Sequence, residues 1–162
     1  MNPVDVLPQL LTRLTNIRDL NCGGCGVFAA HVAKHLKDIV PTRVAVFNRG
    51  EDIKIDEIRP KLRNNHSCVE WADHGMRYDH VMVEFDYDGN TYLFDSRGIF
   101  PVSDKIDLDM YKMTRSGYLT IEEICAIAAN PYPWNHWFNR SQIQSLKNKI
   151  QYFFKKHRVV EA

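Results

Sequence analysis

Residues 80–95 of this chain read HVMVEFDYDGNTYLFD, and they predict a β-hairpin. Both ends of the segment, His80–Phe85 and Thr91–Phe94, are rich in the β-branched and aromatic residues that favour strands. Asp88-Gly89 lies between the two runs, and glycine tolerates the positive φ that a tight hairpin turn requires. The segment is therefore expected to form two antiparallel strands.

The turn also fixes which side chains of the hairpin lie together. With a two-residue turn, Tyr87 pairs with Asn90, and Met82 lies opposite Asp95. Side chains alternate between the faces of a strand, so His80 and Asp95 share one face as diagonal neighbours whose side chains can meet. The opposite face carries apolar side chains: Val81, Val83, Phe85, Tyr92 and Phe94. That apolar face is expected in the core, with the His–Asp pair exposed toward a groove.

Outside the hairpin, periodic patterns predict the rest of the fold. Helices are expected over residues 3–14, 25–37, 121–129 and 142–157, strands over 43–47 and 98–102, and a helix followed by a loop within 51–68. Thr120 and Glu123 have the spacing of a capping box, and Ser141 is expected to cap the last helix. Helices, then a sheet, then helices indicate a single α+β domain over residues 1–162 with an antiparallel sheet.

Composition narrows the class of protein. The chain has 162 residues, of which 44% are hydrophobic and 25% charged, the balance of a soluble globular domain. Because 21 basic residues face 20 acidic ones, no strong nucleic-acid or membrane partner is indicated. No apolar run approaches the roughly 18 residues of a membrane span. The first residues lack a secretory signal, so a cytoplasmic location is expected, where the four cysteines stay as thiols.

A cysteine in a glycine-rich segment is the first candidate for chemistry. The segment Cys22-Gly-Gly-Cys25-Gly26 leads into the helix expected from residue 25. A helix N-terminus stabilises a thiolate, and the glycines are expected to leave the sulfur open to a substrate. Cys25 is the favoured nucleophile because it directly adjoins the helix, and Cys22 is the alternative. The simpler alternative is a buried structural cysteine.

Cys25, His80 and Asp95 together suggest a catalytic triad. In such a triad the histidine takes the thiol proton, and the carboxylate orients the imidazole and supports its positive charge. Taken singly, His80 could be a half-buried strand residue and Asp95 a turn cap. Their expected contact on one strand face favours the catalytic interpretation.

These residues resemble the papain-like cysteine peptidase superfamily in its broad sense, which includes transglutaminase-like Cys-His-Asp enzymes. Residues 22–29, CGGCGVFA, are similar to the family's Cys-Gly-Ser-Cys-Trp-Ala-Phe segment, and residues 95–98, DSRG, are similar to its Asn-Ser-Trp-Gly segment. The resemblance covers about residues 19–98. It implies a papain-like fold, with a nucleophile helix packed on an antiparallel sheet, and a thioester mechanism that needs no cofactor. A protein or peptide substrate is implied as well.

The chain departs from the papain pattern at several positions. Asp19 stands where papain-type enzymes have the glutamine of the oxyanion hole, so Asn21 and the backbone at Gly24 are the expected substitutes. Gly26 replaces a tryptophan, and Asp95 replaces an asparagine, as in the transglutaminase-like branch. Peptidase, amidase, transglutaminase and acyltransferase activities all remain open. The sequence does not fix the oligomeric state.

Two other chemistries compete with the triad. Cys22, Cys25, His31 and His35 suggest a non-enzymatic zinc-binding or interaction module, which Cys68, with His66 and His74 nearby, could extend. The gap between Cys25 and His31 is shorter than zinc fingers use. A thioredoxin-like redox role for the CxxC pair requires a preceding strand, and none is expected.

The C-terminal part of the chain suggests a non-enzymatic binding module as a further alternative. Residues 130–139 are rich in aromatic side chains and are expected to pack the last helix on the core. That helix carries a run of basic residues: Lys147, Lys149, Lys155, Lys156 and Arg158. Such a charge run is usually a solvated face.

Overall fold

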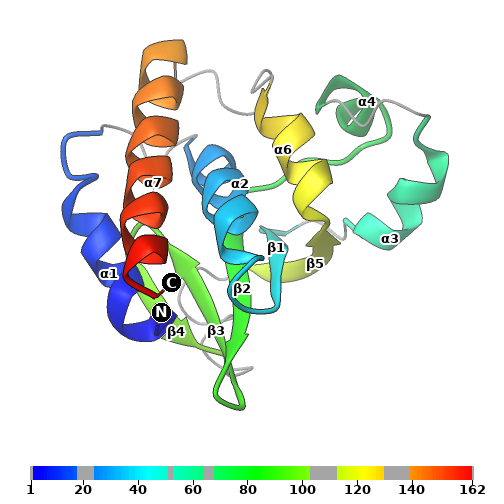
Figure 1. Cartoon of the computed structure of the whole chain (residues 1–162). Helices are drawn as coiled ribbons and strands as arrows, with labels where there is room; N and C mark the ends of the chain where they lie inside the picture. The colour runs from blue at the N-terminus through cyan, green and yellow to red at the C-terminus, as the bar shows by residue number, and fades with distance from the viewer. Residues whose placement is uncertain are drawn as a thin grey trace.

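Five strands form one antiparallel sheet in the computed structural model of the chain, which describes residues 2–17, 24–50, 53–63, 68–102, 113–129 and 139–161. The strands are β1 (Thr42–Asn48), β2 (His80–Tyr87), β3 (Asn90–Asp95), β4 (Gly98–Pro101) and β5 (Thr114–Leu119). Their order across the sheet is β4-β3-β2-β1-β5, and every neighbouring pair is antiparallel (Figure 1). The predicted α+β class with an antiparallel sheet is confirmed.

The β2–β3 hairpin has the predicted register. Tyr87 pairs with Asn90, and Val83 pairs with Phe94. The two turn residues both have positive φ, 51° at Asp88 and 78° at Gly89, as a tight two-residue hairpin turn demands. The turn chemistry readable in the sequence therefore sets the alignment of the two strands.

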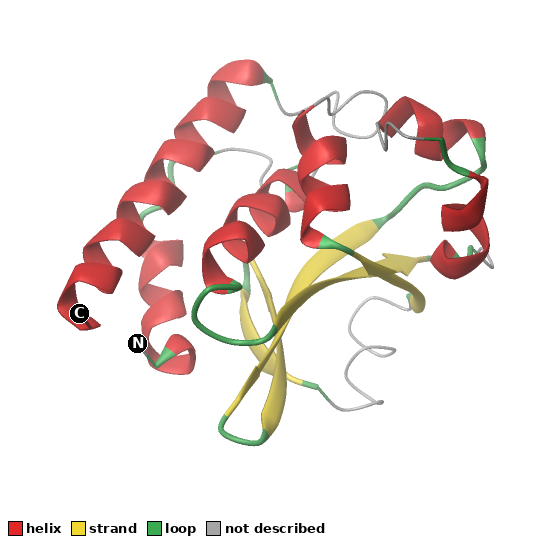
Figure 2. Cartoon of the chain, turned by 45° about the vertical axis from the view of Figure 1, so that its right-hand side comes forward, coloured by secondary structure: helices red, strands yellow, loops and turns green. Residues whose placement is uncertain are grey.

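Helices cover one face of this sheet (Figure 2). They are α1 (Pro3–Thr12), α2 (Cys25–Leu36), α6 (Ile121–Ala129) and α7 (Arg140–Glu161). The central one, α2, contacts β1, β2 and β3 and is flanked by α6 and α7. The predicted core face of the hairpin lies beneath them: Val81, Val83, Phe85 and Phe94 are all buried in the main hydrophobic cluster, and Tyr92 packs against its edge.

Strand β5 was not expected from the sequence. Its residues, TRSGYL, lack a β-rich pattern, and it forms at the edge of the sheet by pairing with β1. The pairing shifts register between Val46 and Phe47, which marks a β-bulge. Gly117 has φ 135°, and a Cβ at this position would lie 3.0 Å from Ile55 Cβ. Tertiary contacts therefore create this strand.

Short helices lie near this end of the sheet. They are α3 (Ile55–Ile58), the 3₁₀-helix η1 (Arg59–Lys61) and α4 (Cys68–Asp73). The first two correspond to the helix expected within residues 51–68, and α4 was not expected. Helix α3 is in contact with β5, and α4 is in contact with α6. No helix in the described part of the chain is both long and apolar enough to cross a membrane.

Capping residues explain where the C-terminal helices begin. In α6 the predicted capping box is present: Glu123 N–H donates to Thr120 Oγ1 at 3.0 Å, and Thr120 N–H donates to Glu123 Oε1 at 2.8 Å. The predicted start of the last helix is wrong, because α7 begins at residue 140 and Ser141 does not cap it. Asn139 caps α7 instead, accepting from Gln142 N–H at 2.9 Å.

Candidate active site

His80 and Asp95 meet at one end of the sheet. His80 is the first residue of β2, and Asp95 is the last residue of β3. His80 Nε2 lies 2.8 Å from Asp95 Oδ2. The diagonal contact that the hairpin register predicted is therefore present, and it joins two strand ends through their side chains.

Cys25 reaches the same point from the helical layer. It is the first residue of α2, and its thiol lies close enough to the His80 ring to raise the pKa of that ring. Because Asp95 occupies Nε2, the other ring nitrogen of His80, Nδ1, is left for the thiol. The structure thus brings together the three residues expected to form a triad.

The helix end beside Cys25 is rich in backbone donors. Gly24 is the N-cap of α2, and its carbonyl accepts the hydrogen bond from Phe28 N–H at 2.9 Å. The N–H groups of residues 25–27 precede this first helical bond and have no partner within the helix. The positive end of the helix dipole therefore lies at Cys25 and favours a negative charge there.

Neighbouring charges keep a proton on His80. Burial of the ring favours its neutral form, but the hydrogen bonds to Asp95 and Cys25 outweigh burial and raise the pKa of His80 to about 9. Burial also opposes ionisation of Asp95, yet the hydrogen bond to His80 and the interactions with Arg97 hold the pKa of this carboxyl below its ordinary value. Both shifts favour an imidazolium beside a carboxylate at neutral pH.

Arg97 is a fourth member of this cluster, and the sequence analysis assigned it no role. Its backbone N–H donates to Asp95 Oδ1 at 2.8 Å, and its Nε donates to Asp95 Oδ2 at 3.1 Å. The guanidinium also lies 3.3 Å from His80 Nε2, so two cations share one carboxylate oxygen. The available signal was an Asp two residues before the arginine, the spacing of an Asx turn.

The expectation that the site faces an open groove is wrong. Cys25, His80 and Asp95 are only 6%, 5% and 1% exposed. Cys25 packs within the main hydrophobic cluster, and the side chain of Arg97, one third exposed, is bonded to the carboxylate. The glycines around Cys25 therefore do not leave its sulfur open to solvent.

Several predicted residues lie outside the described part of the chain. Asn21, the expected oxyanion residue, and Cys22, the alternative nucleophile, belong to this group, as do the aromatic residues 130–138 and His66. Gly24 is described and adjoins Cys25. The roles of Asn21 and Cys22 remain predictions.

The alternative zinc site is not assembled by the residues that can be described. Among them, no group of three or more His, Cys, Asp or Glu side chains is placed to hold a metal ion. Cys25 contacts His80, whereas the His35 ring stacks on Phe154 with centroids 5.2 Å apart. Within the described residues, the element before Cys25 is the helix α1, not the strand that a thioredoxin-like site requires.

No protein-family model, curated protein or solved structure matches this chain. Functional assignment therefore starts from the geometry of the site.

Proposed function

We propose that this protein is a cysteine-dependent hydrolase or acyl-transfer enzyme with Cys25 as nucleophile, His80 as proton carrier and Asp95 as the group that orients His80. One observation carries the proposal: the contact chain from the Cys25 thiol through the His80 ring to Asp95, with 2.8 Å between His80 Nε2 and Asp95 Oδ2. The position of α2 on an antiparallel sheet whose strand ends carry His80 and Asp95 supports a papain-like arrangement.

The first half of the reaction uses the proton held on His80. The Cys25 sulfur, as thiolate, attacks the carbonyl carbon of an amide or ester. As the tetrahedral intermediate collapses, the bond to the leaving nitrogen or oxygen breaks, and His80 donates its proton to that atom. The products of this half are the free amine or alcohol and a thioester on Cys25.

The second half restores the enzyme. Water, or an amine in acyl transfer, attacks the thioester carbonyl while neutral His80 accepts a proton from it. The carbon–sulfur bond breaks, Cys25 leaves as thiolate, and His80 is again an imidazolium. Hydrolase and transferase activities share every step except the identity of this acceptor.

In this mechanism, the backbone at the N-terminus of α2 stabilises the oxyanion. The tetrahedral intermediate carries its negative charge on oxygen beside the Cys25 sulfur, near the N–H groups that have no partner within α2 and the positive end of the helix dipole. The amide side chain of Asn21 is the proposed additional donor. This arrangement suits a peptide or protein carbonyl and requires no metal in the chemical steps.

Thiol labelling tests the assignment. A small reagent, iodoacetamide, is appropriate because Cys25 is only 6% exposed, and Cys125 serves as an internal control. Burial raises the pKa of the Cys125 thiol above its ordinary value, so this residue is expected to react slowly at pH 6.5. Peptide mass spectrometry is expected to find rapid labelling of Cys25 at that pH. The Cys25→Ala variant loses this labelling, and the Cys125→Ala variant keeps it.

A second measurement detects the covalent intermediate. Incubation with p-nitrophenyl acetate is expected to place an acetyl group on Cys25, removable by hydroxylamine as a thioester is. If the acetyl group and the rapid labelling are found on Cys22 instead, the nucleophile is Cys22. If no thiol reacts faster than Cys125 at pH 6.5 and no acyl adduct forms, the proposed function is wrong.

A further inference from the structure

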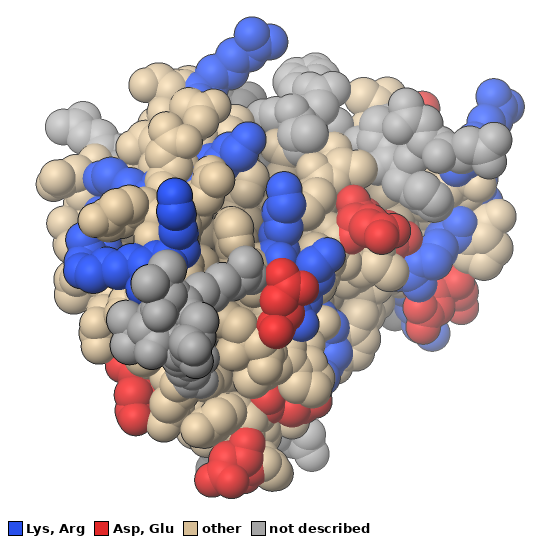
Figure 3. Space-filling view, viewed as in Figure 1, with Lys and Arg blue, Asp and Glu red and all other residues tan. Residues whose placement is uncertain are grey.

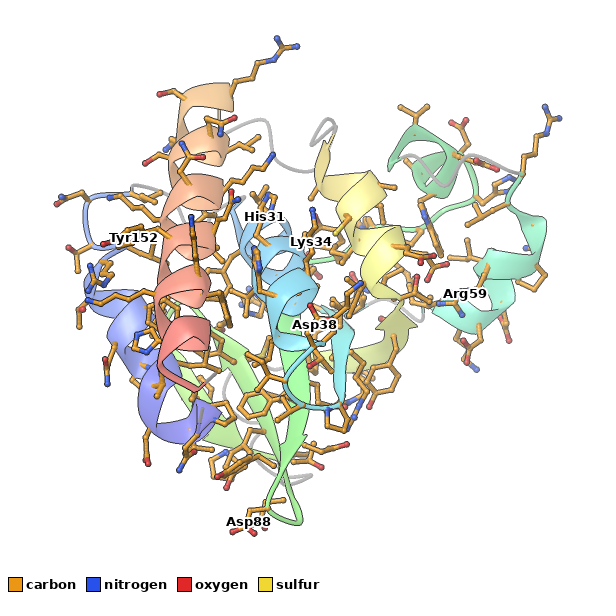
Figure 4. All side chains as sticks on the ribbon, in the orientation of Figure 1. His31, Lys34, Asp38, Arg59, Asp88 and Tyr152 are labelled. Carbon is orange, nitrogen blue, oxygen red and sulfur yellow. The ribbon has the colours of Figure 1, made fainter. Side chains whose placement is uncertain are left out.

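A cavity lies among three helices on the outer side of α2, away from the candidate active site. Its volume is about 280 Å³, close to the lower end of the range for small-molecule sites, and α2, α6 and α7 all contribute to its lining. His31 and Lys34 extend from α2 on the side that lies between α7 and α6 (Figure 4). The cavity therefore uses a different part of α2 from the one that carries Cys25.

The charged groups of this cavity are all basic. Lys34 of α2 and Lys147 of α7 line it together with the His31 ring, and no acidic residue is among the described residues of its lining. Neither lysine forms an ion pair with another residue in the described ranges of the chain. Figure 3 shows basic side chains gathered over α2 and α7 on this face. The cavity thus concentrates positive charge in a molecule whose formal net charge is only +1.

The state of His31 agrees with a positive potential in the cavity. Burial lowers its pKa, and the charges of Lys147, Lys34 and His35 lower it further, to about 4. Each of these neighbouring charges repels a proton on the ring. An anion placed in the cavity would relieve the repulsion among the basic groups.

Apart from the amide of Gln144, the rest of the lining is apolar. Ala30, Ala128 and Ile143 contribute small or aliphatic surfaces, and the Cys125 thiol lies among them. The Cys125 thiol donates a long hydrogen bond, 3.8 Å, to the carbonyl of Ala30. A ligand complementary to this lining has a charged end and a compact hydrocarbon body.

We propose that this cavity binds a small organic carboxylate, with the carboxylate held by the ammonium groups of Lys34 and Lys147 and the hydrocarbon body packed against Ala30, Ala128 and Ile143. A carboxylate fits better than inorganic phosphate because about half of the lining offers no hydrogen-bond donor. The proposal does not depend on the proposed hydrolase function.

Cys125 provides a reporter inside the cavity. Iodoacetate is an anion and iodoacetamide is neutral, and the two are nearly equal in size. In a Cys25→Ser background, the ratio of their labelling rates at Cys125 measures the local attraction for anions, because the fraction of thiolate cancels in the ratio. Lys34→Gln/Lys147→Gln is expected to lower this ratio about tenfold. The matched control, Lys155→Gln, removes a charge from an exposed position of α7 outside the cavity and is expected to leave the ratio nearly unchanged.

Protection experiments then test the class of ligand. Hexanoate is expected to slow iodoacetamide labelling of Cys125 in a saturable way, and the double lysine variant is expected to lose this protection. Hexanamide and inorganic phosphate at the same concentration should protect weakly. Equal protection by hexanamide would overturn the role of charge, and equal protection by phosphate would overturn the role of the apolar lining. Absence of protection by hexanoate, or a charge ratio unchanged in the double variant, would overturn the site itself.

Discussion

Two histidines, His80 and His31, occupy opposite electrostatic environments in one small protein. Burial lowers the pKa of both rings. Beside Asp95 and Cys25, hydrogen bonds raise the pKa of His80 to about 9, whereas the neighbouring lysines help to lower that of His31 to about 4. Burial is the largest cause of the lowered pKa of His31, whereas at His80 the hydrogen bonds to Asp95 and Cys25 overcome the effect of burial. The proposed proton donor lies in one of these regions, and the proposed anion site lies in the other.

The largest effect is expected when each histidine is replaced in turn and the reactivity of Cys25 is compared. His80→Gln is expected to slow iodoacetamide labelling of Cys25 at pH 6.5 by about tenfold or more, because the variant removes the ring proposed to take the thiol proton. His31→Gln is the matched control and should leave the rate within about twofold. Equal losses in both variants would show that Cys25 reactivity does not depend on its contact with His80.

The second test replaces Asp95, the carboxylate that lies beside His80 and has no counterpart among the described residues that line the cavity with His31. Nuclear magnetic resonance titration should show the His80 ring protonated through neutral pH, with a midpoint near 9. Asp95→Asn removes the stabilising carboxylate and is expected to lower this midpoint by more than about one pH unit, while the His31 midpoint stays near 4. A wild-type His80 midpoint near 6.5 would contradict the proposed imidazolium.

The free energy of unfolding at acidic pH also depends on which histidine is considered. The folded pKa of His31 is lower than its ordinary value of 6.5, so the unfolded chain binds more protons between pH 6.5 and 4. The free energy of unfolding should therefore fall as the pH is lowered through this window, by about 1–2 kcal/mol from His31 after allowance for its partial exposure.

Chemical denaturation of wild type and His31→Gln at several pH values measures the contribution of His31 to the free energy of unfolding. The variant is expected to show a flatter profile between pH 6.5 and 4. Asp95 has a lowered pKa, so its contribution is present above its ordinary value near 3.8 and is lost only at still lower pH. Identical profiles for wild type and variant would show that His31 is not held in its neutral form.

The smallest expected effect concerns Arg97. Its guanidinium lies 3.3 Å from His80 Nε2 and shares the Asp95 carboxylate, so it opposes the charge on the ring. Arg97→Met should raise the His80 midpoint by about half a pH unit, since the backbone N–H of residue 97 still holds Asp95 Oδ1. A fall in the midpoint would instead mean that the side chain mainly orients Asp95.

The sequence predicted the parts of the site that depend on local rules. Asp88-Gly89 selects a two-residue turn, and strand alternation then places His80 and Asp95 together. The start of α2 at Cys25 followed from the apolar period after the glycines. Each of these inferences needs only neighbouring residues and the geometry of one element.

Features that depend on tertiary contacts were missed. β5 forms through pairing with β1 and the close approach of Gly117 to Ile55, although its own residues have little strand preference. The burial of Cys25, His80 and Asp95 depends on packing around Cys25 and on Arg97, whose position follows from its bonds to Asp95. The cavity among α2, α6 and α7 likewise exists only after three distant segments have packed together.

The two outer strands of the sheet have a consequence for association between molecules. β4 has only four residues and ends at Pro101, which has no N–H to offer a further strand. β5 contains Gly117 and pairs with β1 across a bulge. Short or bulged edge strands of this kind are poor templates for the addition of a strand from a second molecule. The sheet is therefore protected from the edge-to-edge stacking that leads to aggregation, even though its central strands are strongly β-forming.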